Sequence, residues 1–266
     1  YIEEEHMECY RDLDDIKESF TKFANQTKDL VIANGDLENI RSLKIDKTLY
    51  YGFNDNNDIV IKDAITTDKG SMFKLYDGDK LIGEFYIPLY GMHNVMNATA
   101  AILMAIYLKI DINKIKESLE TFVNAARRFV LIEEKKNVII DDYAHHPTEI
   151  KATLKAARNK YKDKKIIAIF KPNVYSRFVN FKDQYIEAFN EADYTYLTKV
   201  ESNRERYEDY IGYDSNIITD ACSNCSLLYE KDMSILKEYK DVCFVVMSCA
   251  DVVNIIDVLK EYNNEK

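Results

Sequence analysis

The chain has 266 residues, 47% hydrophobic and 31% charged, as expected of a globular protein with room for one or two cores. Its formal net charge of −10 argues against general binding to nucleic acid or to an anionic membrane. No apolar run approaches a membrane-spanning length and no signal peptide is present, so we expect a cytoplasmic protein. Five scattered cysteines fit free thiols in a reducing compartment.

The first half of the chain predicts short helices and strands, followed by a small sheet. Apolar spacing indicates, in order, a helix over 10–25, a strand over 29–34, a short helix over 36–43 and a strand over 48–53. Alternating patterns predict three further strands between residues 58 and 89, with a hairpin turn at 77–79. Residues 91–110 are apolar nearly all round, which predicts a buried helix, and 112–122 predict another.

The second half alternates between short apolar runs and helical patterns. The apolar runs predict strands buried on both faces, over 138–140, 166–170, 194–197 and 242–247. The helical patterns cover 148–161, 181–191, 234–239 and 251–262. This alternation is typical of a parallel sheet covered by helices, so the predicted fold class is α/β.

The change of pattern near residues 122–127 predicts a domain boundary. We therefore expect one domain over 1–123 and a second domain, with the parallel sheet, over 124–266. No stretch rich in proline, glycine or serine marks the boundary, so the two domains are expected to pack closely.

Polar residues follow the predicted strand at 138–140, in the sequence DDYAHHP. Ligands of open parallel sheets bind beyond the carboxyl ends of the strands, and the free N–H groups that begin a helix favour an anion. Pro147 suits the first turn of such a helix, where its missing N–H costs nothing. Residues 141–146 therefore predict a functional loop.

The histidine pair in this loop has three possible roles. His145 and His146 can donate hydrogen bonds to phosphate or carboxylate oxygens, cap the helix or lie in the core, or bind zinc in a metal hydrolase. Adjacent histidines chelate poorly and no third ligand stands at H-x-x-x-H spacing, which disfavours zinc. Asp141 and Asp142 similarly suit magnesium, a ribose hydroxyl or solvent.

Two further segments strengthen the prediction of a site. Residues 170–177, FKPNVYSR, follow the next strand with a stiff loop that ends in a cation, Arg177. Two polar loops at one sheet edge make a site more credible than either loop alone. Arg127 and Arg128, at the predicted boundary, suit either a phosphate clamp or a surface salt bridge.

Candidate residues also occur in the first half. His93, Asn94 and Asn97 open the predicted helix at 91–110, where amides suit an adenine edge and capping is the alternative for Asn94. His6 lies among four carboxylates, which suits a divalent cation or merely an acidic terminus; they are Glu3, Glu4, Glu5 and Glu8.

These motifs, in this order, resemble the Mur ligases of peptidoglycan synthesis over nearly the whole chain. The matching stretches are IEEEHMECY, GMHNVMNATAAI, ARRF, DDYAHHPTEIKATLKAAR, FKPNVYSR and ESNRE. The resemblance implies the remnant of a central ATP-binding domain followed by a Rossmann-like C-terminal domain with a mostly parallel sheet. It also implies a fragment without the N-terminal domain and the phosphate loop, because the chain starts at Tyr1 and none of its seven glycines precedes a lysine.

The implied activity is ATP-driven addition of L-alanine to UDP-N-acetylmuramate through an acyl phosphate. Mg²⁺ and fixed cations would stabilise the negative charge that develops. ATP and Mg²⁺ are thus the expected cofactors, with UDP-N-acetylmuramate and L-alanine as partners and neither nucleic acid nor membrane. A tripeptide-recycling ligase acting on the same sugar nucleotide and a non-catalytic nucleotide-binding fragment are the alternatives, and these 266 residues alone are expected to be inactive.

The resemblance also implies roles for individual residues. Arg128 and His145 are the expected catalytic residues, with Arg128 at the ATP phosphates. The other expected nucleotide contacts are His93, Asn94 and Asn97 at the adenine, and Asp142 and Tyr143 near the ribose and phosphates. The muramyl substrate is expected to meet His145, His146 and Arg177, and His6 is the expected metal ligand.

Two positions depart from the family pattern. Asn173 stands where the family often has histidine, which changes one expected substrate contact. Ser248-Cys249-Ala250 precedes Asp251 where the family has Gly-Ala-Gly, so side chains are expected to narrow that end of the cleft.

Overall fold

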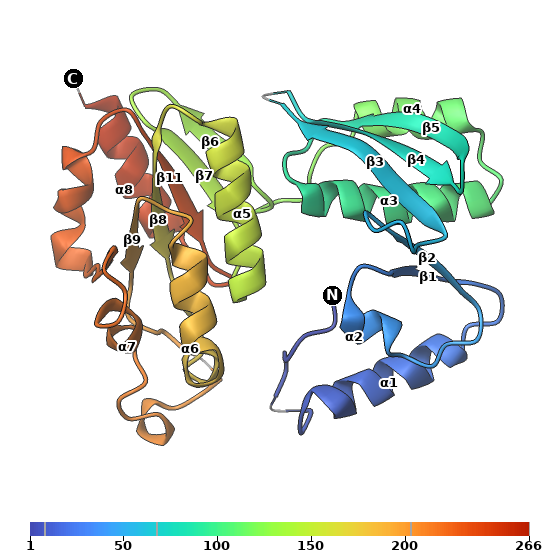
Figure 1. The fold of residues 1–266 in the computed structure, drawn as a ribbon. Coiled ribbons are helices and arrows are strands. Elements are labelled where there is room, and N and C mark those ends of the chain that lie inside the picture. The colour runs from blue at the N-terminus through green and yellow to red at the C-terminus, as the bar shows by residue number, and fades with distance from the viewer. Residues whose placement is uncertain (8, 68, 203, 266) are drawn as a thin grey trace. The chain divides into compact units, whose positions relative to one another are not determined.

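Two separate sheets organise the chain. The computed structural model describes residues 1–265 apart from 8, 68 and 203, and it divides into the units Tyr1–Val123 and Asn124–Lys266. Each unit contains one sheet (Figure 1). The separate functional roles expected of the two halves stay proposals.

The sheet of the first unit combines parallel and antiparallel pairing. Its strands, in spatial order, are β1 (Val31–Asn34), β2 (Thr48–Gly52), β3 (Ile59–Thr66), β4 (Ser71–Asp77) and β5 (Lys80–Ile87). The first three run parallel and the last three antiparallel. Its helices are α1 (Leu13–Asn25), α2 (Glu38–Arg41), α3 (Met92–Tyr107) and α4 (Ile112–Glu120). The elements predicted from apolar spacing are confirmed in this half.

Helix α3 packs on the sheet through one face. Val95 and Ile102 are fully buried against strand residues that include Phe73 and Leu75. The prediction that this helix is buried all round is wrong, because Met104 and Tyr107 remain 44% exposed. The apolar composition of a helix alone does not predict how many of its faces pack against other elements.

The second unit contains the mostly parallel sheet that the sequence predicted. Its strands are β6 (Val130–Glu134), β7 (Val138–Asp142), β8 (Lys165–Phe170), β9 (Tyr194–Leu197), β10 (Cys225–Leu227) and β11 (Val242–Met247). They lie in the order β10-β9-β8-β11-β7-β6, and only the edge strand β6 is antiparallel to its neighbour. The strand β11 therefore lies between β7 and β8.

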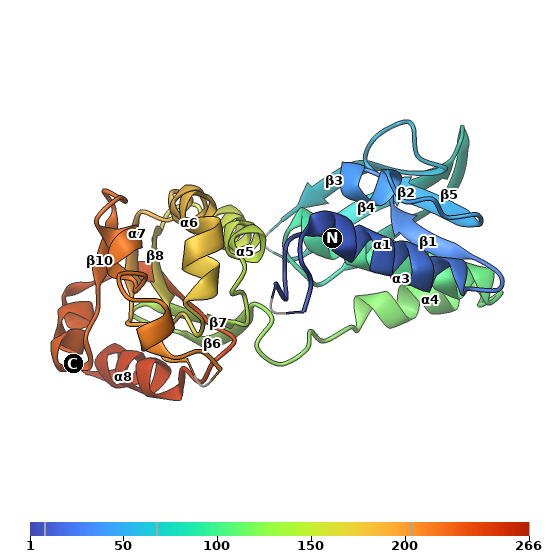
Figure 2. The same cartoon turned by 90° about the horizontal axis from the view of Figure 1, so that it is seen from below.

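Helices cover both faces of this second sheet (Figure 2). They are α5 (Pro147–Lys160), α6 (Ser176–Phe189), α7 (Asn216–Thr219) and α8 (Val253–Asn264), with the 3₁₀ helices η1 (Tyr207–Asp209) and η2 (Glu230–Glu238). Alternate residues of the central strands point to opposite faces. Ile140 and Val245 pack with α5 and α6, whereas Ile139 and Phe244 pack with η2 and α8.

Two predicted helix assignments in this half are wrong in detail, and three short elements were missed. Helix α6 begins at Ser176 and not at 181, because Phe181 is non-helical (φ −128°, ψ 24°) and the apolar period becomes regular only beyond it. The helix expected at 234–239 is the 3₁₀ helix η2. The strands β6 and β10 and the short helix α7 were not predicted.

Within the described part of the chain, no helix combines the length and apolar character needed to cross a bilayer.

Candidate functional site

The loop after β7 is organised by the buried carboxylate of Asp142. Its Oδ2 atom accepts a hydrogen bond from the N–H of Phe129 and its Oδ1 atom accepts one from the N–H of Ala144, both at 2.7 Å. Burial raises the pKa of Asp142 above its ordinary value, an effect opposed by these backbone donors and by the Thr153 side chain. Asp142, which was expected near the ribose, therefore links the backbone at Phe129 to the backbone at Ala144.

A cluster of polar side chains lies on this framework. Arg128 has its Nη1 atom 4.0 Å from Glu149 Oε1 and its guanidinium 5.3 Å from the centre of the Tyr143 ring. His145 Nδ1 lies 3.3 Å from Glu149 Oε2 and 3.0 Å from the Tyr143 carbonyl oxygen. The structure thus brings the two expected catalytic residues, Arg128 and His145, to the same carboxylate.

His146 has the alternative role that the sequence allowed, as a helix cap. Its side chain accepts the N–H of Thr148, while Glu149 accepts the N–H of His146 in return, which completes a capping box at the start of α5. The ring is 8% exposed and packs edge-on against Phe181. A direct contact between His146 and substrate stays a prediction.

The loop after β8 ends in a second cluster. Arg177 lies in the first turn of α6 and not at the end of a loop as expected, and its Nη1 atom donates to Asn173 Oδ1 at 3.1 Å. The Cys249 thiol, beyond β11, lies close enough to Arg177 for that cation to oppose the rise that burial causes in the pKa of the thiol. The two positions at which the sequence departs from the family pattern, Asn173 and Cys249, thus meet at one guanidinium.

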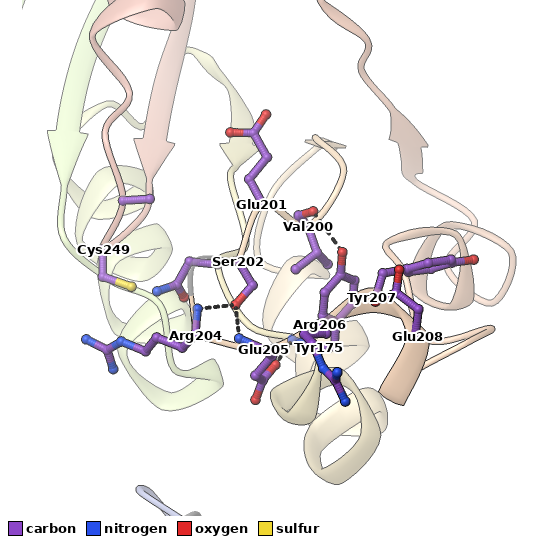
Figure 3. A pocket seen from close by; sticks show the side chains of 12 residues that line it. Tyr175, Val200, Glu201, Ser202, Arg204, Glu205, Arg206, Tyr207, Glu208 and Cys249 are labelled. Atoms are coloured by element: carbon purple, nitrogen blue, oxygen red, sulfur yellow. Dashed lines mark hydrogen bonds between the residues drawn. The ribbon is translucent and has the colours of Figure 1, made fainter.

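A hollow of about 730 Å³ lies beside this second cluster. Its walls come from the loops after β8, β9 and β11, and the residues are Asn173, Tyr175, Val200, Glu201, Ser202, Arg204, Glu205, Arg206, Tyr207, Glu208, Cys249 and Ala250. Figure 3 shows Cys249 and Arg204 at one side of the hollow and Tyr207 and Glu208 at the other. Such a position, beyond the carboxyl ends of parallel strands, is where open α/β sheets bind ligands.

Most charges that line the hollow already have partners. Lys171 pairs with Glu201 at 2.8 Å and Arg206 with Asp209 at 2.9 Å. In the described part of the chain, no ion pair or side-chain hydrogen bond involves the guanidinium of Arg204. That cation is therefore the one best placed to receive an anionic group from a ligand.

The carboxylate of Glu205 caps helix α6 from across the hollow. Its Oε2 atom accepts the N–H of Tyr175 at 2.5 Å and that of Ser176 at 3.1 Å. We expect Glu205→Ala to lower the free energy of unfolding by about 1–2 kcal/mol, the usual cost of a lost cap. Urea unfolding measures this loss.

Glu208→Ala is the matched control for this prediction, because Glu208 lines the same hollow and is exposed. We expect a change within about 0.5 kcal/mol for that variant. Equal losses in both variants would contradict the capping role of Glu205.

The candidate residues of the first unit occupy the start of α3 and the N-terminal segment. Gly91, with a left-handed φ of 91°, precedes α3 and sets its entry. Asn94 donates from Nδ2 to the Tyr90 carbonyl at 2.8 Å, and Asn97, one turn on, is exposed. His93 is half-buried beside them. Their contacts to adenine stay predictions.

The structure gives no support for a metal centre in the residues it describes. His6 is exposed, and no group of three His, Cys, Asp or Glu side chains converges as a metal site among the described residues. Glu8, one of the expected carboxylates, lies outside those residues. The same result removes support from a zinc hydrolase built on His145 and His146.

The cysteines differ from expectation at one pair. Cys222 and Cys225 form a disulfide between α7 and β10, so the expectation of five free thiols is wrong for these two. Cys9, Cys243 and Cys249 are free. Burial raises the pKa of Cys243 to about 12 and also raises the pKa of Cys249, whose thiol is only partly buried.

Family profiles match both units. The Mur ligase middle domain matches residues 1–105, and the Mur ligase glutamate ligase domain matches residues 127–246. The chain therefore belongs to the Mur ligase family, as the order of its motifs indicated.

Among curated proteins, the chain is similar in sequence to particular members of this family. The chain is 38% identical over 252 residues to a UDP-N-acetylmuramate–L-alanine ligase of Lacticaseibacillus paracasei, covering 94% of the chain and 57% of that relative. It is 38% identical over 253 residues to the enzyme of the same name from Lactiplantibacillus plantarum, covering 94% and 58%. The chain thus spans less than two thirds of the relatives it matches.

Solved structures agree on the fold. The UDP-N-acetylmuramate–alanine ligase of Thermotoga maritima superposes with a TM-score of 0.73 at 22% identity, over 97% of this chain and 56% of that one. MurF from Acinetobacter baumannii superposes with a TM-score of 0.77 at 15% identity, over 99% and 58%. At these identities the likeness establishes the Mur ligase fold alone.

Proposed function

We propose that the whole protein joins L-alanine to UDP-N-acetylmuramate with hydrolysis of ATP, in the cytoplasm. The observation that carries this proposal is the 38% identity, across 94% of the chain, to relatives named for that reaction. The muramyl carboxylate attacks the γ-phosphate of ATP, which breaks the bond to the β-phosphate, releases ADP and forms an acyl phosphate. The amine of L-alanine then displaces the phosphate and forms the amide bond.

Arg128 is proposed to neutralise the phosphate charge that this sequence of steps creates. Its side chain is 48% exposed and its nearest carboxylate, Glu149, is 4.0 Å away, so the guanidinium can turn to an incoming anion at small cost. A fixed cation contributes most where charge develops in the transition state. The contacts of Arg128 to Tyr143 and Glu149 support a defined starting position for that movement.

His145 is proposed to donate a hydrogen bond to the muramyl substrate or its phosphate. Two acceptors, the Tyr143 carbonyl and Glu149, face its Nδ1 atom, so Nδ1 carries the proton in the neutral ring. Donation from the other ring nitrogen to a substrate oxygen requires the doubly protonated ring, in which both nitrogens are donors. His145 in that form would hold an anionic oxygen.

The hollow beside Arg177 is proposed to hold the amino acid. Arg204 offers a cation for its carboxylate, and Cys249 occupies the space next to it. The volume of about 730 Å³ exceeds what one alanine fills, so further chain segments or substrate atoms must complete the site. The muramyl acyl phosphate is the natural second occupant, since the amine must reach it.

Mg²⁺ would neutralise the ATP phosphates in such a reaction. The described residues around His6 do not assemble a donor set for it. His93, Asn94 and Asn97 are proposed to hold the adenine, from the start of α3.

Phosphate release by the full-length protein tests the proposed function. We expect release that requires ATP, UDP-N-acetylmuramate and L-alanine together, and mass spectrometry should find the alanyl product. No release with all three present would refute the proposal.

A tripeptide-recycling ligase is the second candidate, favoured by the size of the hollow. A murein peptide ligase from Psychrobacter arcticus has the same fold, with a TM-score of 0.65 and 21% identity over 97% of this chain. The same assay separates the two, because the recycling activity requires product formation with L-alanyl-γ-D-glutamyl-diaminopimelate in place of L-alanine.

A further inference from the structure

One arginine side chain joins the two clusters of the candidate site. Arg127 donates from Nη2 to the Ser248 carbonyl at 2.7 Å and from Nη1 to the Ala250 carbonyl at 2.8 Å. These two carbonyls flank Cys249. The guanidinium therefore fixes the short loop over residues 248–250, which places Cys249 beside Arg177 and the hollow.

The remaining contacts of Arg127 reach the first cluster. Its Nε atom donates to the buried carboxylate of Asp141, 3.1 Å away at the end of β7. Its own carbonyl accepts the N–H of Tyr143 at 2.7 Å, and its guanidinium lies 5.4 Å from the Tyr143 ring centre. Tyr143 is thus held between Arg127 and Arg128.

The backbone on both sides of Arg128 is in a sparsely populated conformation. Arg127 has φ 58° and Phe129 has φ 53°, values that L-residues other than glycine and asparagine seldom adopt. Such backbone persists only where surrounding contacts determine it. Here those contacts are the Arg127 guanidinium on one side and the Asp142 carboxylate, which accepts the Phe129 N–H, on the other.

We propose that Arg127 is a positioning residue, which fixes the 248–250 loop and the backbone of Arg128 in one arrangement. The role rests on the proposed function, since the cluster at Arg128 would receive the phosphate and the cluster at Arg177 the amino acid. Arg127 touches neither group itself. It sets the distance between the Cys249 wall of the hollow and Arg128.

Only arginine supplies this geometry. Two carbonyls and one carboxylate are contacted by three different nitrogens of a planar fork. A lysine at 127 retains the charge that Asp141 requires but offers one nitrogen in place of three. Arg127→Lys therefore separates the positioning role from neutralisation of Asp141.

Arg158 is the matched control within the same unit. It also contacts two carbonyls and a carboxylate, those of Lys164, Glu191 and Asp193. These contacts lie at the amino ends of β8 and β9, opposite the candidate site. Arg158→Gln should lower stability without affecting the 248–250 loop.

Alkylation of Cys249 measures the loop directly. Iodoacetamide labels the full-length wild-type, Arg127→Lys, Arg127→Gln and Arg158→Gln proteins, and peptide mass spectrometry follows Cys249 with time. We expect both Arg127 variants to label about fivefold faster than wild type, because the loop opens more often, and Arg158→Gln to label at the wild-type rate. Circular dichroism checks that each variant is folded. If Arg127→Gln does not fold, Arg127→Lys alone provides the test.

Steady-state kinetics measure the consequence for the ligase. We expect both Arg127 variants to raise KM for L-alanine about tenfold with a smaller change in KM for ATP, and Arg158→Gln to change neither. Unchanged Cys249 labelling in both Arg127 variants, or wild-type labelling in the lysine variant alone, would overturn the positioning role. An inactive wild-type enzyme would refute the proposed function, while the labelling rates would still decide whether Arg127 holds the loop.

Discussion

Replacing Asp142 with alanine is expected to lower the free energy of unfolding by about 2–4 kcal/mol. The change leaves the N–H groups of Phe129 and Ala144 without their acceptor in a site where Asp142 itself is 5% exposed. Each lost bond leaves a donor that water reaches poorly. Urea unfolding of the 266-residue chain measures the loss.

Asp142→Asn is the companion variant, because its amide oxygen can still accept one of the two N–H groups. We expect it to lose about half as much stability as the alanine variant. Equal stability of Asp142→Ala and wild type would show that the carboxylate does not organise the loop.

The difference in stability between wild type and Asp142→Asn is expected to depend on pH. The pKa of folded Asp142 is raised above its ordinary value of 3.8, so the folded state binds the proton more tightly than the unfolded state. The proton-linked part of the Asp142 contribution to stability is therefore fully present below the unfolded pKa and is lost as the pH rises through the folded pKa, whereas the two backbone hydrogen bonds do not depend on that proton. The advantage of wild type over Asp142→Asn should grow on acidification, and a constant difference would contradict the raised pKa.

Replacing Arg128 with alanine is expected to reduce kcat of the full-length ligase by about 10²–10³-fold, the usual cost of a lost charge-stabilising donor. The free energy of unfolding should change by no more than about 0.5 kcal/mol, since the side chain is 48% exposed and makes one ion pair at 4.0 Å. Initial rates of phosphate release, together with urea unfolding of the same variant, measure both quantities.

Arg11→Ala is the matched control for Arg128→Ala, because Arg11 is 80% exposed and likewise bonded to one carboxylate, Asp15. It should retain the wild-type kcat. Wild-type turnover in the Arg128 variant would remove this residue from the proposed mechanism.

The parallel sheet of the second unit was predictable because its strands are buried on both faces. Residues 138–140, 166–170 and 242–247 are continuous apolar runs, and each became a strand of that sheet. The edge strand β6 begins with a similar apolar run over 130–132, but it ends in Glu133 and Glu134 and its residues are exposed or only partly buried, so burial on both faces does not mark it. The pairing of β6 with β7 is set by register across a short turn, which apolar patterning does not reveal.

The candidate site was predictable where motif and strand end coincide, as at Asp142 and His145. The contribution of Arg127 was not, because its partners Ser248 and Ala250 are more than 120 residues away and offer only backbone carbonyls. Glu205 was missed for the same reason, since it caps a helix whose first residue lies 29 positions earlier in the chain. A hydrogen bond between a side chain and a distant backbone group cannot be predicted from the types of the two residues.

The central position of β11 affects when the second unit can fold during translation. Strands β7 and β8 are adjacent in the chain but cannot pair with each other, since β11 occupies the position between them. Until residues 242–247 emerge, both present bare apolar edges to solvent and to neighbouring nascent chains. The first unit, whose strands pair in order of synthesis, can close earlier. Chaperone demand during translation should therefore concentrate on the second unit.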